Sequence, residues 1–252
     1  MKKMFLGLAV ILGAAIVSPA KSNAENKFTV NGKADFVSDY IWRGADQNSG
    51  FSVQPSLTLG YAGLSLNVWG SQSLTKWASD LDANIPVHGA KEFDINLSYT
   101  IQGFTIMVSD LWWSGMNRAY GDYANSHWFE GTVSYDFSAC SNGKVPLFIS
   151  WSTVFAGGAD KNSSGKQNFS TYVSASYPIA LPADITLTPS VGFLPWGAVY
   201  HGLDKIAWTD ISLKASKDIK VTENFAIPLF VQALVSPVFD RTYLIAGFSL
   251  GF

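Results

Sequence analysis

Charged residues and cysteine are both scarce in this chain. Asp, Glu, Lys and Arg make up 14% of its 252 residues, whereas soluble domains carry roughly a quarter. The single cysteine excludes an internal disulfide framework. The formal net charge of −2 argues against a nucleic-acid partner, because such partners require a basic surface.

Long apolar runs are also missing after the N-terminal segment, so the sequence offers no candidate for a membrane-spanning helix. Yet 48% of the residues are hydrophobic and 14% are aromatic. Apolar residues that are abundant but not contiguous can be spread along alternating strands, as they are in transmembrane β-barrels.

The start of the chain has the pattern of an export signal. Two lysines precede an apolar segment over 4–17, and small residues follow it just before Glu25. The apolar segment is short for a transmembrane anchor, which is the alternative interpretation. We therefore expect residues 1–24 to be a cleaved signal peptide and residues 25–252 to be the mature protein.

Segments in which apolar and polar residues alternate follow one another along the mature chain. Twelve such segments can be recognised, at 28–43, 51–61, 64–69, 92–100, 103–113, 127–137, 145–155, 169–177, 185–196, 207–217, 225–235 and 243–252. An alternation with a period of two predicts β-strands. About ten residues are enough for a tilted strand to cross a membrane.

The connections between these segments alternate in length. Short ones fall at 62–63, 101–103, 138–144, 179–184 and 218–224; longer or more polar ones fall at 44–50, 74–91, 114–126, 156–167 and 197–206, with a last one at 237–242. Short periplasmic turns and longer outer loops are typical of bacterial outer-membrane barrels. The fold we predict is an all-β, transmembrane, antiparallel up-and-down barrel of about twelve strands. A soluble lipocalin-like or sandwich fold, with the apolar face inside, is the alternative.

If the apolar face meets lipid, the other face lines the lumen, and its charged residues are few. We predict that the pore lining includes Lys33, Asp35, Asp39, Arg43, Asp94, Glu130, Asp210 and Lys214, and Glu92 shares the phase of Asp94. These charges either pair with one another in a narrow interior or form a constriction that selects solutes. The sequence leaves both readings open.

The strongest concentration of such charges is expected near the outer mouth. Asp39 and Arg43 would lie on one strand, about 13 Å apart at 3.3 Å per residue, which is too far for a direct salt bridge. Glu130 and Asp210 are then the candidate acceptors for Arg43. The lumen of a twelve-stranded barrel is wider than that of an eight-stranded barrel, which side chains fill, and narrower than the channel of a sixteen-stranded porin. Bulky inward side chains such as Tyr172 therefore predict a narrow path for small solutes.

Aromatic residues gather near both predicted ends of the strands, where the two membrane interfaces favour them. The outer set comprises Tyr40, Trp42, Trp112, Trp113, Trp128, Trp151, Phe155 and Trp196, and the inner set comprises Tyr61, Tyr99, Phe137 and Tyr177. Together they predict two aromatic belts on the outside of the barrel.

The segment Ser38-Asp39-Tyr40-Ile41-Trp42-Arg43-Gly44, followed by Gln54-Pro55-Ser56, resembles the opening of a known family. It is similar to the first strand of the TorF-like outer-membrane porins. The local resemblance covers about thirty-five residues, and the sequence differs from the pattern at Ala45-Asp46-Gln47. The resemblance implies a porin-like barrel without naming a solute.

We expect no catalysis, cofactor or metal. The histidines His88, His127 and His201 fall in or beside outer loops, and none has the spacing of a metal pair or a nucleophile–base pair. Cys140 falls in a predicted periplasmic turn without an evident role. The function predicted is a narrow passive channel for small polar or charged solutes; the alternative is a closed structural or adhesive surface barrel.

The expected location and partners follow from the same pattern. The chain is expected in the bacterial outer membrane, with lipid around its wall and small polar solutes in its lumen. Its last strand ends on Phe252 and resembles the C-terminal signal of outer-membrane barrels. We therefore expect it to be recognised by the barrel assembly machinery.

Overall fold

The computed structural model describes the chain except for residues 1–26, 48–49, 76–90, 114–118, 224 and 252. The predicted signal peptide, most of the 74–91 loop and Phe252 lie outside the described residues. In the described part, no helix is long and apolar enough to cross a membrane. The only helices there are short 3-10 turns, η2 (Pro182–Asp184) and η3 (Val199–His201).

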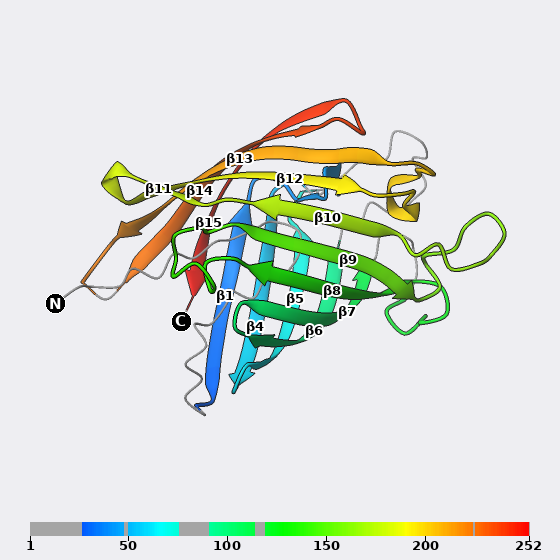
Figure 1. Cartoon of the computed structure of the whole chain (residues 1–252), viewed down its shortest axis with the longest axis horizontal. Coiled ribbons are helices and arrows are strands. Elements are labelled where there is room, and N and C mark those ends of the chain that lie inside the picture. The colour runs from blue at the N-terminus through cyan, green and yellow to red at the C-terminus, as the bar shows by residue number, and fades with distance from the viewer. Residues whose placement is uncertain (1–26, 48–49, 76–90, 114–118, 224, 252) are drawn as a thin grey trace.

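One antiparallel sheet forms the wall of the molecule and closes on itself (Figure 1). Its strands are β1 (Thr29–Val37), β4 (Ser52–Tyr61), β5 (Leu64–Ser73), β6 (Lys91–Ile101), β7 (Phe104–Trp113), β8 (His127–Asp136), β9 (Phe148–Ala156), β10 (Thr171–Ser176), β11 (Ile179–Leu181), β12 (Ile185–Leu194), β13 (Ala207–Lys220), β14 (Ala226–Ser236) and β15 (Arg241–Gly251).

The first and last strands of the barrel lie side by side. β1 pairs with β15 from Lys33 opposite Gly251 to Val37 opposite Gly247. β10 and β11 both pair with β12, so they share one position in the wall. The predicted twelve-stranded, closed antiparallel barrel is thereby confirmed. The predicted connection at 179–184 is wrong in its first half, because Ile179–Leu181 continues the wall.

The apolar side chains of the barrel lie on its outer face. Large hydrophobic residues that stay exposed include Leu57, Leu66, Leu97, Ile106, Leu213, Val231 and Leu244, whereas buried polar residues on the opposite face include Gln54, Asn67, Asn96, Ser109, Ser212 and Gln232. A water-soluble barrel would reverse this arrangement. The polarity is that of a transmembrane barrel, and the soluble alternative is wrong.

The two ends of the barrel differ. We call the end that carries 62–63, 102–103, 137–147, 182–184 and 221–225 the short-turn end, and the other the long-loop end. Positive φ values at Ala62 (+49°) and Gly63 (+88°) show why the tightest turn is possible. Two consecutive residues with positive φ define the hairpin turn that matches the twist of paired strands.

The segment predicted as the outer part of strand one leaves the wall. β1 ends at Val37, and the chain forms a separate two-stranded hairpin, β2 (Ile41–Trp42) with β3 (Ala45–Asp46). A single strand over 28–43 is therefore the wrong prediction. We call residues 40–47 the plug hairpin, because its first half, from Tyr40 to Gly44, is buried among side chains of the barrel interior, while residues 45–47 are half-buried.

Candidate functional site

The plug hairpin is built around a tight turn at Arg43 and Gly44. Both residues have positive φ, +52° and +80°, and Trp42 pairs with Ala45 on either side of them. A Cβ on Gly44 would lie only 2.1 Å from the carbonyl oxygen of Thr209 in β13. Glycine is therefore required twice here, for the backbone conformation and for the close approach to the wall.

Apolar contacts hold the plug hairpin in the lumen on two sides. Ile41 packs in a cluster with Val37, Phe230, Leu234 and Ile245. On its other side, Tyr40 and Trp42 belong to a cluster with Leu111, Trp128 and Val154, against which Trp69, Trp113 and Tyr200 also pack. The exposed fractions of Tyr40, Ile41 and Trp42 are 3%, 2% and 4%. Burial this complete makes the hairpin a plug rather than a surface loop.

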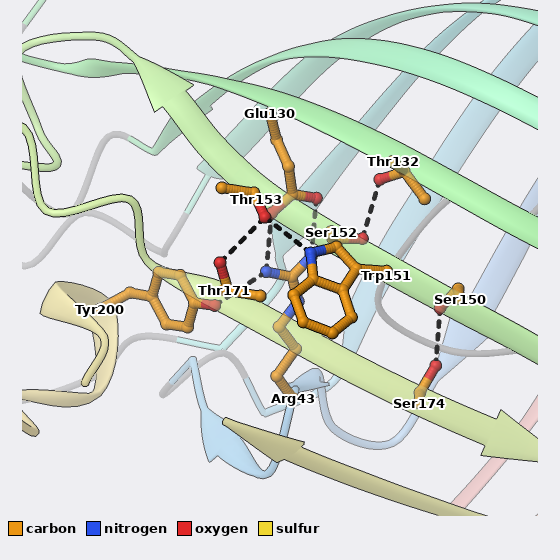
Figure 2. A network of polar contacts seen from close by, with 10 residues as sticks. All are labelled: Arg43, Glu130, Thr132, Ser150, Trp151, Ser152, Thr153, Thr171, Ser174 and Tyr200. Carbon is orange, nitrogen blue, oxygen red and sulfur yellow. Dashed lines mark hydrogen bonds and ion pairs between the residues drawn. The ribbon is translucent and has the colours of Figure 1, made fainter. Parts of the chain in front are cut away.

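Arg43, at the tip of the plug hairpin, is clamped by Glu130 of β8. Its two terminal nitrogens each donate to one carboxylate oxygen of Glu130, both at 2.7 Å, and Nη1 also donates to the Tyr200 hydroxyl at 3.2 Å (Figure 2). The guanidinium carbon lies 4.4 Å from the ring centroid of Trp42 and 4.7 Å from that of Tyr172. A bidentate pair between stacked aromatic rings is the arrangement that arginine forms best.

The connection between β12 and β13 closes over the tip of the plug hairpin. His201 Nε2 lies 2.8 Å from the backbone oxygen of Arg43, and its ring stacks on Phe239 at 5.3 Å. Its other nitrogen, Nδ1, is buried without a hydrogen-bond partner in the described structure. Burial, together with the Arg43 charge, lowers the pKa of His201 to about 4 although the bond to the Arg43 backbone opposes it. His201 is therefore neutral and donates from Nε2.

Two irregularities in the wall face this site. The register between β8 and β9 shifts between Phe129 and Glu130, just where the Glu130 side chain turns towards Arg43. The register between β12 and β13 shifts at Gly192, whose missing side chain leaves room for the hydrogen bond from Tyr172 to Asp210 at 3.0 Å. Bulges commonly re-aim side chains at functional sites in this way.

The predicted lumen residues separate into distinct groups. Arg43 donates to Glu130, which is one of the two acceptors predicted for it. Asp210 instead accepts from Tyr172 and from Thr209, at 3.0 and 2.8 Å. Asp39 lies between β1 and the plug hairpin and accepts the backbone N–H of Tyr40 at 2.8 Å. The single strand predicted to carry both Asp39 and Arg43 is wrong, because β1 ends at Val37 and Arg43 lies in the turn of the plug hairpin.

A second ion pair lies on β1. Lys33 donates to Asp35 at 2.7 Å, and Asp35 also accepts from Ser249 at 2.5 Å. Lys214 of β13 is buried, with its ammonium 4.3 Å from the centre of the Phe230 ring. These three predicted residues thus occupy the β1–β13 side of the lumen, away from the clamp on Arg43.

Asp94 and its neighbour Glu92 form a third group, on β6. Their exposed fractions are 8% and 5%, and each has one carboxylate oxygen without a hydrogen-bond partner among the described residues. The Tyr40 hydroxyl is hydrogen-bonded to Glu92, and burial and these two carboxylates raise the pKa of Tyr40 well above its ordinary value. The plug hairpin therefore rests directly on this pair.

Several hydroxyl groups of β8, β9, β10, β12 and β13 pair with one another across neighbouring strands. Thr132 pairs with Ser152 and Ser150 with Ser174, each at 2.8 Å (Figure 2). Ser190 and Ser212 pair in the same way at 2.7 Å. Cross-strand pairs of this kind stabilise a sheet and leave few groups to bind a solute.

The predicted outer aromatic belt is only partly correct. Trp151, Phe155 and Trp196 are exposed on the outside, at 44%, 46% and 42%. Tyr40, Trp42 and Trp128 are instead buried in the lumen. Half of the predicted outer set therefore packs around the plug. Of the predicted inner set, Tyr61, Tyr99 and Tyr177 are exposed, whereas Phe137 is half-buried.

The histidines and the single cysteine lie in different surroundings. His127 and His201 are buried rather than solvated, and the His127 ring contacts Asp110 at 2.6 Å through Nδ1; His88 lies outside the described residues. Within the described ranges, no group of three or more His, Cys, Asp and Glu could hold a metal. Cys140 is exposed in the 137–147 connection, at the short-turn end.

The contacts of Tyr200 and His201 with Arg43 were not predicted from the sequence, which places both residues in the polar 197–206 connection. The signal that could have found them is an aromatic–histidine pair inside an otherwise polar connection. Alternation could not show it, because period-two patterns describe only the wall.

The chain matches a protein-family model over residues 21–233, described as "Bacterial protein of unknown function (Gcw_chp)". The chain belongs to this family. A search of curated proteins finds no match. Membership is thus shown, while the more specific resemblance to TorF-like porins stays a prediction.

Solved structures similar to this one include several porins. One is the KdgM porin in complex with disordered oligogalacturonate, with 9% identity, 88% of this chain and 95% of that chain covered, and a TM-score of 0.41. Another is the Salmonella typhi OmpF complex with daunomycin, with 10% identity, 90% and 98% covered, and a TM-score of 0.40. A mutant Rh. blastica porin has 12% identity, 90% and 100% covered, and a TM-score of 0.37.

Proposed function

We propose that this protein is an outer-membrane, porin-like conduit for small polar solutes, closed at its long-loop end by the plug hairpin. The apolar outer face supports a place in lipid, and the polar inner face supports a hydrated path. The plug would then determine when solutes pass.

One observation carries this proposal. Among the described residues, backbone–backbone hydrogen bonds of the plug hairpin join β2 to β3 and the Gln47 N–H to the Tyr40 oxygen, and the Arg43 oxygen accepts from the His201 side chain rather than from a wall strand. Wall strands, by contrast, are joined by continuous ladders on both sides. The hairpin can therefore leave the lumen without breaking a single hydrogen bond between wall strands.

The lumen on the short-turn side of the plug is lined mainly by small polar groups. Its buried residues include Ser65, Asn67, Asn96, Ser98, Ser134, Ser150, Ser249 and Gln232. Hydroxyl and amide groups replace the water around small polar solutes without fixing their charge. With the plug displaced, the path would admit such solutes and exclude polymers, because twelve strands enclose a narrow barrel.

We also propose an orientation and partners for the barrel in the outer membrane. Outer-membrane lipid would cover the wall, the long-loop end would face outwards, and the barrel assembly machinery would recognise the C-terminal strand β15. The resemblance of residues 38–44 to TorF-like porins supports this placement, and no catalytic role is proposed. Heat-modifiable gel mobility of the membrane-extracted protein tests it, and recovery as a detergent-independent soluble monomer would contradict it.

A permanently closed surface barrel is the second candidate. It is favoured by the nearly complete burial of Arg43, at 5% exposed, and of its aromatic neighbours. In that case the plug would be a core that stabilises the barrel, and the long loops would make contacts outside the cell.

Conductance in planar bilayers separates these two functions. The refolded wild-type barrel is expected to show rare, brief openings, and Arg43→Ala is expected to raise the open time because it releases the tip of the plug. A wild type and an Arg43→Ala variant that both stay silent at every voltage would favour the closed surface barrel.

A further inference from the structure

The Glu92–Asp94 pair is a buried acidic site that the protein itself leaves incomplete. Both carboxylates lie on the lumen face of β6, and each keeps one oxygen without a hydrogen-bond partner in the described structure. Buried carboxylates are normally paired, hydrogen-bonded or bound to a cation. The two carboxyl groups hydrogen-bond each other, and Glu92 also bonds Tyr40, but one oxygen on each is left over. Two neighbouring oxygens without a partner point to a ligand that they would share.

The surrounding charges make the site more negative. Asp110 lies close enough to repel Asp94, whereas the charge of the nearby Glu130 is compensated by Arg43. The Arg43 guanidinium is at the same end of the lumen, but both its terminal nitrogens are bound to Glu130. The positive charge of the plug is thus already neutralised, and the electrostatic field at Glu92 and Asp94 favours a cation.

Aromatic side chains adjoin the same site. Tyr40 is hydrogen-bonded to Glu92, and its ring meets Trp69 edge to face at 5.7 Å. Trp69 is also the partner of Asp94 in the β5–β6 ladder. Aromatic faces attract cations, including ammonium groups, most strongly where water is excluded.

Unpaired oxygens continue from this site towards the short-turn end. Asn96 donates to Asn67 at 3.1 Å in the next lumen-facing row, and beyond it the hydroxyls of Ser65 and Ser98 are buried without a partner within the described ranges. The β5–β6 wall therefore presents a row of oxygen acceptors from the short-turn side to the carboxylates. Such a row suits a partly hydrated cation.

We propose that Glu92 and Asp94, with Tyr40 and Trp69 beside them, form a binding site for a small cation that enters from the short-turn end. The cation is an alkali or alkaline-earth ion or a primary ammonium, which share the need for oxygen acceptors. Its binding beneath Tyr40 would couple the occupancy of the lumen to the position of the plug hairpin. This site requires access to the lumen from one end only, so it does not rest on conduction.

Thermal melting of the full-length mature barrel in detergent tests the site. Potassium, calcium and methylammonium chlorides are titrated separately at constant ionic strength. At least one of these cations is expected to raise the melting temperature with saturation, because a ligand stabilises the state that it binds. Glu92→Gln and Asp94→Asn should each weaken that binding by about tenfold or more.

Asp35→Asn is the matched control, because Asp35 is also a buried lumen carboxylate but already has Lys33 as its cation. Its binding constant should stay within about twofold of that of the wild type. If no probe gives a saturable shift, or if all three variants respond alike, the site does not exist. A barrel that binds the cation but never conducts would contradict the conduit and leave this site standing.

Discussion

Glu130 and the Glu92–Asp94 pair lie at the same end of the lumen, yet the protein surrounds them differently. Glu130 receives two charge-assisted hydrogen bonds from Arg43 at 2.7 Å. Glu92 and Asp94 receive no cation from the described residues and keep unpaired oxygens. The oxygens of Glu130 are thus occupied in holding the plug hairpin, whereas Glu92 and Asp94 each keep one oxygen that could bind a ligand.

This difference shows how a charged lumen can serve two purposes. A buried carboxylate that is fully paired is part of the structure, and removing its partner is costly. A buried carboxylate that is not paired costs stability in the empty protein and is therefore expected to serve binding. Substitutions at Arg43, Glu130 and Glu92 should therefore differ in their effects on stability.

Arg43→Ala should have the largest effect, because it leaves Glu130 buried and uncompensated. Loss of one partner of a buried pair costs about 3–5 kcal/mol of unfolding free energy. Denaturant unfolding of the barrel in detergent or vesicles measures the loss. As a control, Arg43→Met combined with Glu130→Leu should recover much of it, since the double variant strands no charge. Equal stability of Arg43→Ala and the wild type would remove the clamp from the account.

Acid should weaken the plug through His201. The pKa of His201 is about 4 in the folded protein, against 6.5 for an ordinary histidine, so the unfolded chain binds the proton first. The unfolding free energy should therefore be constant above the higher value and fall as the pH drops from it towards the lower one, by about 3 kcal/mol in total.

The matched variant for this pH dependence is His201→Gln, which keeps an N–H donor but does not titrate in this window. Its unfolding free energy should fall less than that of the wild type between these pH values. Parallel curves for the two proteins would show that His201 is not responsible.

Glu92→Gln and Glu130→Gln make the same chemical change and should have opposite effects. In buffer without a binding cation, Glu92→Gln should raise the unfolding free energy by about 1–3 kcal/mol, because it replaces a buried carboxyl group that repels Asp94 by a neutral amide. Glu130→Gln should lower it, because it weakens the clamp on Arg43. Destabilisation of similar size in both variants would remove the contrast between the two sites.

The smallest difference is expected between two serines. Ser150→Ala removes a hydroxyl that pairs with Ser174 at 2.8 Å and should cost about 1 kcal/mol. Ser98→Ala removes a buried hydroxyl without a partner in the described structure, so its cost should be close to zero. Melting temperatures of the two variants, measured side by side, check this comparison. A greater loss in Ser98→Ala would indicate a partner that the structure does not show.

The wall of the barrel could be predicted from the sequence, because each wall residue faces either lipid or lumen. The alternation in β14 places Leu229, Val231 and Val235 outside and Gln232 inside, as observed. The lengths of the connections predicted which end of the barrel carries the short turns and which carries the long loops. The extension of the wall by β11 (Ile179–Leu181) was missed, since three residues are too few to show a period, and β5 and β13 run further than the predicted 64–69 and 207–217.

The plug could not be predicted in this way. Residues 38–44 continue the alternation of β1, and the sequence gives no sign that Ser38 ends the strand. What turns the segment inwards is long-range: Gly44 meets β13, Arg43 meets Glu130, and Ile41 packs against Ile245. The bond between Arg43 and Glu130 was foreseen because both have lumen phase, although its geometry was not.

Replacement of the plug hairpin shows whether this segment closes the lumen. A variant in which residues 40–47 are exchanged for a short glycine–serine linker keeps every ladder between wall strands. In planar bilayers, it is expected to show steady, low-noise conductance where the wild type shows only brief openings. A linker variant that folds with wild-type heat modifiability but conducts no more than the wild type would contradict the account, because the hairpin would then not be what closes the lumen.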